Sequence, residues 1–119
     1  MEQESFRWEV SIIRLDVKAP RKAKTHGEIG EMRVFDDRLV WRKHKSIFGN
    51  PPWTGALAFD SITNVEVTRK NIVDGRLWVS HRGGELCFHL PGGSDKAREI
   101  AEFIAAARGV TPSPLSDEP

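Results

Sequence analysis

The sequence contains one cysteine, Cys87, and has no long uninterrupted apolar run. A single cysteine excludes an intrachain disulfide and a zinc site with two cysteine ligands from one chain, so a reducing cytoplasm is the expected compartment. The first residues lack a basic stretch followed by an apolar run, and no segment approaches the ~20 apolar residues that cross a bilayer. We therefore expect a cytoplasmic protein that is neither exported by a signal peptide nor membrane-spanning.

The sequence also lacks an excess of either charge, with 18 lysines and arginines against 17 acidic residues. Hydrophobic residues make up 39% and charged residues 29% of the 119 residues, a balance typical of a globular domain. This length has room for one domain, which we place at residues 1–110. Residues 111–119 hold three prolines and no periodicity, so we expect a flexible tail.

Signatures of catalysis, nucleotide binding and metal binding are absent. The paired glycines at 83–84 and 92–93 lack the spacing of a Walker or dinucleotide loop. The four histidines form no H-x-H or H-E-x-x-H motif, and there is no C-x-x-C. Turn formation explains the adjacent carboxylates Asp36 and Asp37. The sequence predicts a protein that is not an enzyme and has no cofactor and no metal.

Alternating apolar patterns separated by turn residues predict a chain of short strands. The first segment, residues 6–17, also fits a helical stripe. Its aromatic and β-branched content favours a strand, which would require a bulge between Ile12 and Ile13. The other predicted strands are residues 28–35, 38–45, 56–59, 62–69, 76–82 and 85–90.

Two hairpins follow from turn chemistry. An acidic turn at 36–37 would place Val34 opposite Leu39 and Met32 opposite Trp41 on a core face. A turn at Gly83 and Gly84 would pair Arg82 with Glu85, Val79 with Phe88 and Leu77 with Leu90. The face predicted to point away from the core carries Trp78, Ser80, Arg82, Glu85, Cys87 and His89.

The last regular element is predicted to be a helix. Ser94 or Asp95 would cap its start, it would run to about Arg108, and Gly109 would end it in the left-handed conformation. An apolar stripe predicts that this helix packs on the sheet. The stripe consists of Ala97, Ile100, Phe103, Ile104 and Ala107.

The order of these elements resembles a known superfold. The runs GEIGEMRVFDDRLVWRKHK, GALAFDSITNVEVTRK and GRLWVSHRGGELCFHLPGGSDKAREIAEFIAAA, with Ile62 and Val65 as an I-x-x-V pair, resemble bacterial pleckstrin-homology-like (PH-like) and GRAM-like domains, including those of uncharacterised actinobacterial proteins. The resemblance implies a mainly β fold with one C-terminal α-helix, in which the helix caps a barrel of two near-orthogonal antiparallel sheets with six or seven strands. The implied activity is binding of a protein, a peptide or a membrane surface.

A basic segment lies between the first two predicted strands. In eukaryotic PH domains the equivalent loop holds phosphoinositide phosphates, so the resemblance implies an anion-binding or lipid-binding loop that would bring the protein to an anionic membrane surface. A solvated linker is the alternative interpretation. The residues concerned are Lys18, Arg21, Lys22 and Lys24.

Aromatic residues suggest a second kind of site. Phe48 and Trp53 lie in an apolar loop that would insert into a partner or a bilayer interface, or else fold back over a barrel end. Trp78 and His89 lie on the predicted outer face. Our leading hypothesis is an interaction module that binds a protein partner or a second copy of itself, through a sheet edge or through the face of Trp78, Cys87 and His89. No nucleic-acid partner is expected, because alternation splits the basic and aromatic residues at 41–45 between two faces.

Overall fold

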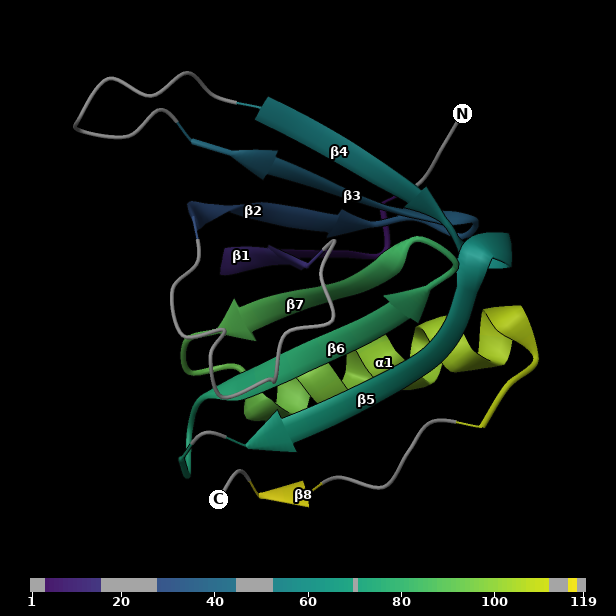
Figure 1. Ribbon diagram of the computed structural model, residues 1–119. Helices are drawn as coiled ribbons and strands as arrows, with labels where there is room; N and C mark the ends of the chain where they lie inside the picture. Colours follow the sequence, from purple (N-terminus) through teal and green to yellow (C-terminus); the bar gives the residue numbers. More distant parts are fainter. Residues whose placement is uncertain (1–3, 16–27, 45–52, 70, 112–115, 118–119) are drawn as a thin grey trace.

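A computed structural model describes residues 4–15, 28–44, 53–69, 71–111 and 116–117. Within these residues the fold is a sheet of eight strands in the order β4-β3-β2-β1-β7-β6-β5-β8, with one helix packed against it (Figure 1). The predicted mainly β fold with one C-terminal helix is confirmed. The elements are β1 (Phe6–Leu15), β2 (Glu28–Val34), β3 (Arg38–Lys43), β4 (Trp53–Ala58), the 3-10 turn η2 (Phe59–Ser61), β5 (Ile62–Arg69), β6 (Gly75–His81), β7 (Gly84–Leu90), α1 (Ser94–Arg108) and β8 (Ser116–Asp117).

Strand β1 is the corner that joins the two halves of the sheet. It pairs antiparallel with β2 through Phe6–Ile12 and antiparallel with β7 through Ser11–Leu15. The first segment is therefore a strand, as predicted. The predicted bulge between Ile12 and Ile13 is wrong, because both registers run without a shift. Ser11 and Ile12 pair with β2 and β7 at the same time, and the pairing with β7 continues in register through Ile13 to Leu15.

The hairpin of β2 and β3 has the predicted register. Val34 pairs with Leu39 and Met32 with Trp41, and all four side chains are buried. The N–H of Phe35 donates to the carbonyl oxygen of Arg38 at 2.9 Å, which closes the two-residue turn at 36–37.

The hairpin of β6 and β7 is shifted by two residues from the prediction. Val79 pairs with Leu86, and His81 with Gly84, so the turn consists of Arg82 and Gly83. The N–H of Gly83 donates to Nδ1 of His81 at 3.1 Å, and Gly84 enters the strand with a φ of 149° that favours glycine. A shift of two residues keeps every side chain on its predicted face.

The helix ends as predicted and begins differently. Gly109 is left-handed, with φ 80° and ψ 27°, and its N–H donates to the carbonyl oxygen of Ala105. The predicted cap by Ser94 or Asp95 is wrong, because the N-cap residue is Gly93 and no side chain caps the helix. The N–H of Ser94 donates instead to the carbonyl oxygen of Val73 at 3.0 Å.

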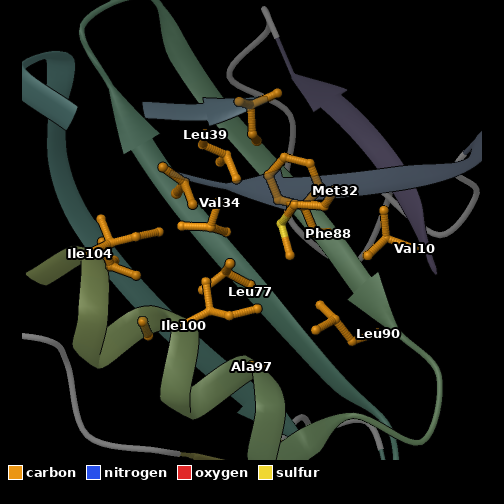
Figure 2. Packing of buried hydrophobic residues seen from close by; sticks show 14 of the residues in the cluster. Val10, Met32, Val34, Leu39, Leu77, Phe88, Leu90, Ala97, Ile100 and Ile104 are labelled. Atoms are coloured by element: carbon orange, nitrogen blue, oxygen red, sulfur yellow. The ribbon is translucent and has the colours of Figure 1, made fainter. Parts of the chain in front are cut away.

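Buried side chains from both halves of the sheet and from α1 form one core (Figure 2). Phe88 on β7 is fully buried near its centre and meets Trp41 edge-on, with ring centroids 5.9 Å apart. Phe103 is half-buried and packs edge-on against Phe6, with ring centroids 5.4 Å apart. Ala107, predicted to face the core, is exposed. The buried helix residues are Ala97, Ile100, Ala101, Ile104 and Ala105.

Several strand ends differ by one or two residues from the prediction, and two further differences concern β4 and the C-terminal segment. Strand β4 begins at Trp53, whereas the sequence predicts a loop to Thr54 and a strand from Ala56. Two residues of the C-terminal segment form β8, which pairs in parallel with β5 at Thr68 and Arg69. Among the described residues, no helix is both long and apolar enough to span a membrane.

Candidate functional site

The side chains of Trp78 and Cys87 on β6 and β7 lie on one face, as predicted, but the aromatic side chain of that face is buried. Trp78 and Cys87 are paired opposite each other on the side away from the main core, and they are 2% and 0% exposed. The indole N–H of Trp78 donates to Oγ1 of Thr68 at 2.8 Å. The expectation that Trp78 is exposed for a partner is therefore wrong.

His89 lies on the same face, half-buried, opposite Arg76 in the register. Its Nε2 is 3.9 Å from Oδ2 of Asp74, whose other oxygen accepts a hydrogen bond from the N–H of Gly92 at 2.7 Å. Asp74 also accepts from the side chain of Asn71 at 3.0 Å. His89 thus lies next to a hydrogen-bond network of Asp74, Asn71 and Gly92 that links the connections on either side of β6 and β7. In the part of the chain that the structure describes, no three potential metal ligands cluster.

Of the other candidate site residues, the structure describes only Trp53. Trp53 begins β4, with its backbone opposite Lys43. The basic segment and the apolar loop tip lie outside the described residues, and their roles stay predictions. These residues are Lys18, Arg21, Lys22, Lys24 and Phe48.

A different candidate surface lies at the edge of the sheet. Strand β4 is the last strand of the order and has only β3 as its neighbour among the described strands (Figure 1). Two hydrogen bonds show which residues of β3 bond to β2. The carbonyl oxygen of Arg38 accepts from the N–H of Phe35, which directly follows β2, and the N–H of His44, just beyond β3, donates to the carbonyl oxygen of Ile29 at 3.0 Å. Backbone groups of alternate residues point to opposite neighbours in an antiparallel ladder. Even-numbered residues of β3 therefore bond toward β2, and odd-numbered ones toward β4.

This alternation fixes which backbone groups of β4 point outward. The odd-numbered residues of β3 pair with Gly55 and Leu57, whose N–H and C=O groups consequently point inward to β3. The bond from the N–H of Phe59 to the carbonyl oxygen of Asp37, 3.0 Å long, continues the same pattern. The residues whose N–H and C=O groups point to the open edge are Thr54, Ala56 and Ala58.

Strand β4 lacks the features that commonly prevent another strand from pairing with a sheet edge. Native edge strands are commonly blocked by charged residues, proline or bulges. The segment Trp53–Ala58 contains no charged residue and no proline, and its pairing with β3 has no register shift. The side chains of Thr54, Ala56 and Ala58 are small and exposed. An extended chain can therefore approach the backbone of β4 closely.

A shallow recess lies beside this edge on the outer face of β2, β3 and β4. Its volume is about 170 Å³, below the roughly 300–1,000 Å³ of small-molecule sites. A recess of this size suits one side chain of a partner better than a cofactor. It is lined by Glu31, Arg33, Val40, Trp41, Arg42 and Thr54.

Most of the charged groups near the recess are paired. Nε of Arg33 donates to Oε1 of Glu31 at 2.7 Å. Arg7 donates to both carboxylate oxygens of Glu4, at 2.8 and 3.0 Å, and this hydrogen bonding lowers the pKa of the Glu4 carboxyl. Arg42 is exposed and makes no ion pair or hydrogen bond with another described side chain. The sequence predicts binding through a sheet edge, but it identifies neither β4 as that edge nor the recess beside it, because both depend on which strand ends the sheet.

Comparison with solved structures identifies the fold. The hSac2 domain from the human phosphoinositide phosphatase Sac2 superposes with a TM-score of 0.60 at 10% identity, over 99% of this chain and 79% of that one. The PH domain of USP37 gives 0.59 at 18% identity, over 88% of this chain and 98% of that one. The Spt16D Pob3N heterodimer gives 0.57 at 14% identity, over 98% and 58%. The chain therefore has a PH-like fold.

No protein-family model matches the chain, and no curated protein sequence does. The resemblance to bacterial GRAM-like and actinobacterial domains stays a prediction. At these identities the solved structures establish the architecture, and the function has to be argued from the surface of this chain.

Proposed function

We propose that this PH-like chain is a non-enzymatic interaction module that binds an extended segment of a protein partner by strand addition at the β4 edge. The observation that carries the proposal is the row of outward backbone donors and acceptors at Thr54, Ala56 and Ala58 on an uncharged edge strand. In strand addition, main-chain hydrogen bonds supply affinity and alternate side chains supply specificity.

The edge is a better binding surface than the face of β6 and β7. Interface anchors are side chains that a partner can reach and bury. Trp78 and Cys87 are already buried in the isolated chain, so they have little further surface to lose. The backbone groups of β4 gain new partners on association. Pairing with the β4 strand of a second copy is the homo-oligomeric form of the same function.

The substitution Ala56→Pro tests the proposal. Proline removes the outward N–H of residue 56 and places its ring where an added strand would lie, but it leaves the inward bonds of Gly55 and Leu57 in place. We expect a folded variant whose affinity for the captured partner falls roughly tenfold or more, since a lost hydrogen bond and a steric block together exceed about 1.4 kcal/mol. Affinity capture from source-cell extract with both proteins in parallel, followed by titration of the captured partner, measures this.

Two variants serve as controls. Ala56→Val changes the same side chain but keeps the N–H, so it should retain binding. Leu57→Pro removes an inward N–H instead and should lower the stability of the β3–β4 pair. A partner that binds Ala56→Pro as tightly as the wild type would contradict strand addition at β4.

Membrane binding is the alternative function, carried by Lys18, Arg21, Lys22 and Lys24. Its test is sedimentation with vesicles rich in phosphatidylserine at low salt, using the chain and a variant with these four residues replaced by glutamine. Two results together would favour the lipid function over strand addition. The vesicles would retain the wild-type chain but not the glutamine variant, and Ala56→Pro would not change the affinity for any protein partner.

A further inference from the structure

We infer that the strand added to β4 is acidic, with a carboxylate beside Thr54 and an apolar side chain two residues away, beside Ala56. This inference rests on the proposed function, because it names the chemistry of the partner at the same edge. It is carried by the recess next to β4 and by the charges around it.

The strand register places the recess within reach of a partner side chain. Thr54 is opposite Arg42, and Ala56 is opposite Val40. An added strand would lie about 4.8 Å from β4 and therefore about 10 Å from β3. The long Arg42 side chain and a glutamate or aspartate on the partner can close that distance across the small Thr54 side chain. The partner residue beside Ala56 meets an uncharged surface.

The charges of β3 and β4 favour a carboxylate. The outward side chains of β4 are uncharged, and those of β3 include no acidic residue. The one carboxylate that lines the recess, Glu31 on β2, accepts a hydrogen bond from Arg33 at 2.7 Å. Arg38 already pairs with Asp37 at 2.9 Å, and its guanidinium stacks 4.3 Å from the Phe35 ring centroid. Arg42 is exposed, and no described side chain forms an ion pair with it. Arginine binds a carboxylate with two parallel hydrogen bonds, so Arg42 is the recognition residue.

The same charges argue against a second copy as the occupant. The segment Trp53–Ala58 contains no acidic residue. If two β4 edges paired, each copy would present Arg42 to a strand without a carboxylate. Charge complementarity therefore points to a different protein that carries an acidic extended segment.

Two synthetic peptides test the inference. Each has seven residues, with valine at the second and sixth positions and threonine at the other flanking positions; one carries glutamate and the other glutamine at the central, fourth position. Isotope-labelled chain is titrated with each peptide, and the backbone amide signals of Thr54, Ala56 and Ala58 are followed by NMR. We expect the glutamate peptide to bind roughly fivefold more tightly at low salt, the upper range for an exposed ion pair. The difference should vanish at about 1 M salt, where the Debye length is about 3 Å.

Three variants separate the inference from the proposed function. Arg42→Gln should remove the preference for glutamate but keep binding. Arg82→Gln, which lowers the net charge equally at the β6–β7 turn, should leave the preference unchanged. Ala56→Pro should abolish the binding of both peptides.

Equal binding of the two peptides, with loss of both in Ala56→Pro, would overturn the acidic partner and leave strand addition standing. Binding that survives Ala56→Pro, or no shift of the edge amides at millimolar peptide, would overturn both. Concentration-dependent dimers in light scattering that Ala56→Pro abolishes would identify a second copy as the occupant and overturn the inference.

Discussion

Replacing Phe88 with alanine is expected to lower the free energy of unfolding by about 3–5 kcal/mol, the usual cost of truncating a buried phenylalanine. Phe88 is fully buried on β7 and contacts Trp41 from the other half of the sheet. Its loss would leave a cavity where the two halves meet. In a domain of this size the midpoint of thermal unfolding should fall by about 10–20 °C. Circular dichroism during heating measures the change.

The matched control truncates an exposed apolar side chain. Ile72 is 90% exposed in the turn between β5 and β6, so Ile72→Ala should change the free energy of unfolding by less than about 0.5 kcal/mol. If Phe88→Ala lowered the free energy of unfolding no more than Ile72→Ala does, this result would contradict the packing of Phe88 between the two halves of the sheet.

Gly30→Ala is expected to produce the second large effect. A Cβ at this position would collide with the carbonyl oxygen of Arg42 and lie 2.9 Å from Cα of Lys43. These are backbone atoms of β3, so β2 and β3 would have to move apart. We expect a loss of about 3 kcal/mol in urea unfolding, at the upper end for overpacking. The amide of His44, which donates to Ile29 beside the same position, should exchange faster with solvent.

Gly83→Ala provides the comparison for this effect. A Cβ there would meet only the His81 ring, at 3.3 Å, in the turn between β6 and β7. A side chain at the turn can move more readily than a paired strand, so the cost should stay below about 1 kcal/mol. Equal stability losses in the two variants would argue against the close approach of β2 and β3. Gly30→Ala should also weaken binding at β4, because β3 carries both β4 and Arg42.

The local elements of the fold follow from the sequence because short-range chemistry determines them. The acidic turn at 36–37 sets the β2–β3 register, and Gly109 ends α1 where its conformational freedom is needed. The β6–β7 register came out two residues away, because two adjacent glycines allow more than one two-residue turn. The faces were nevertheless right, since strand alternation is unchanged by a shift of two.

Features that depend on distant pairing were harder to predict. The sequence of β1 suits a helix or a strand, and its pairing with both β2 and β7 decides between them. Alternation placed Trp78 on the outer face correctly, but it gives no information on whether that face is covered. For the candidate site, the sequence predicts a loop to Thr54 and a short strand from Ala56, whereas β4 already begins at Trp53. Its importance arises from its place at the end of the sheet, which is a property of the topology.

The corner strand β1 also constrains how the chain reaches its native state. The end of β1 pairs only with β7, which is far along the sequence, so residues 13–15 have no described strand partner until β7 has been synthesised. Such distant contacts slow folding, because a long loop must close before they form. We expect the β2–β3 hairpin to form early and a fragment ending before β7 to stay incompletely folded. Completion of this domain on the ribosome would therefore have to wait until β7 has emerged from the exit tunnel.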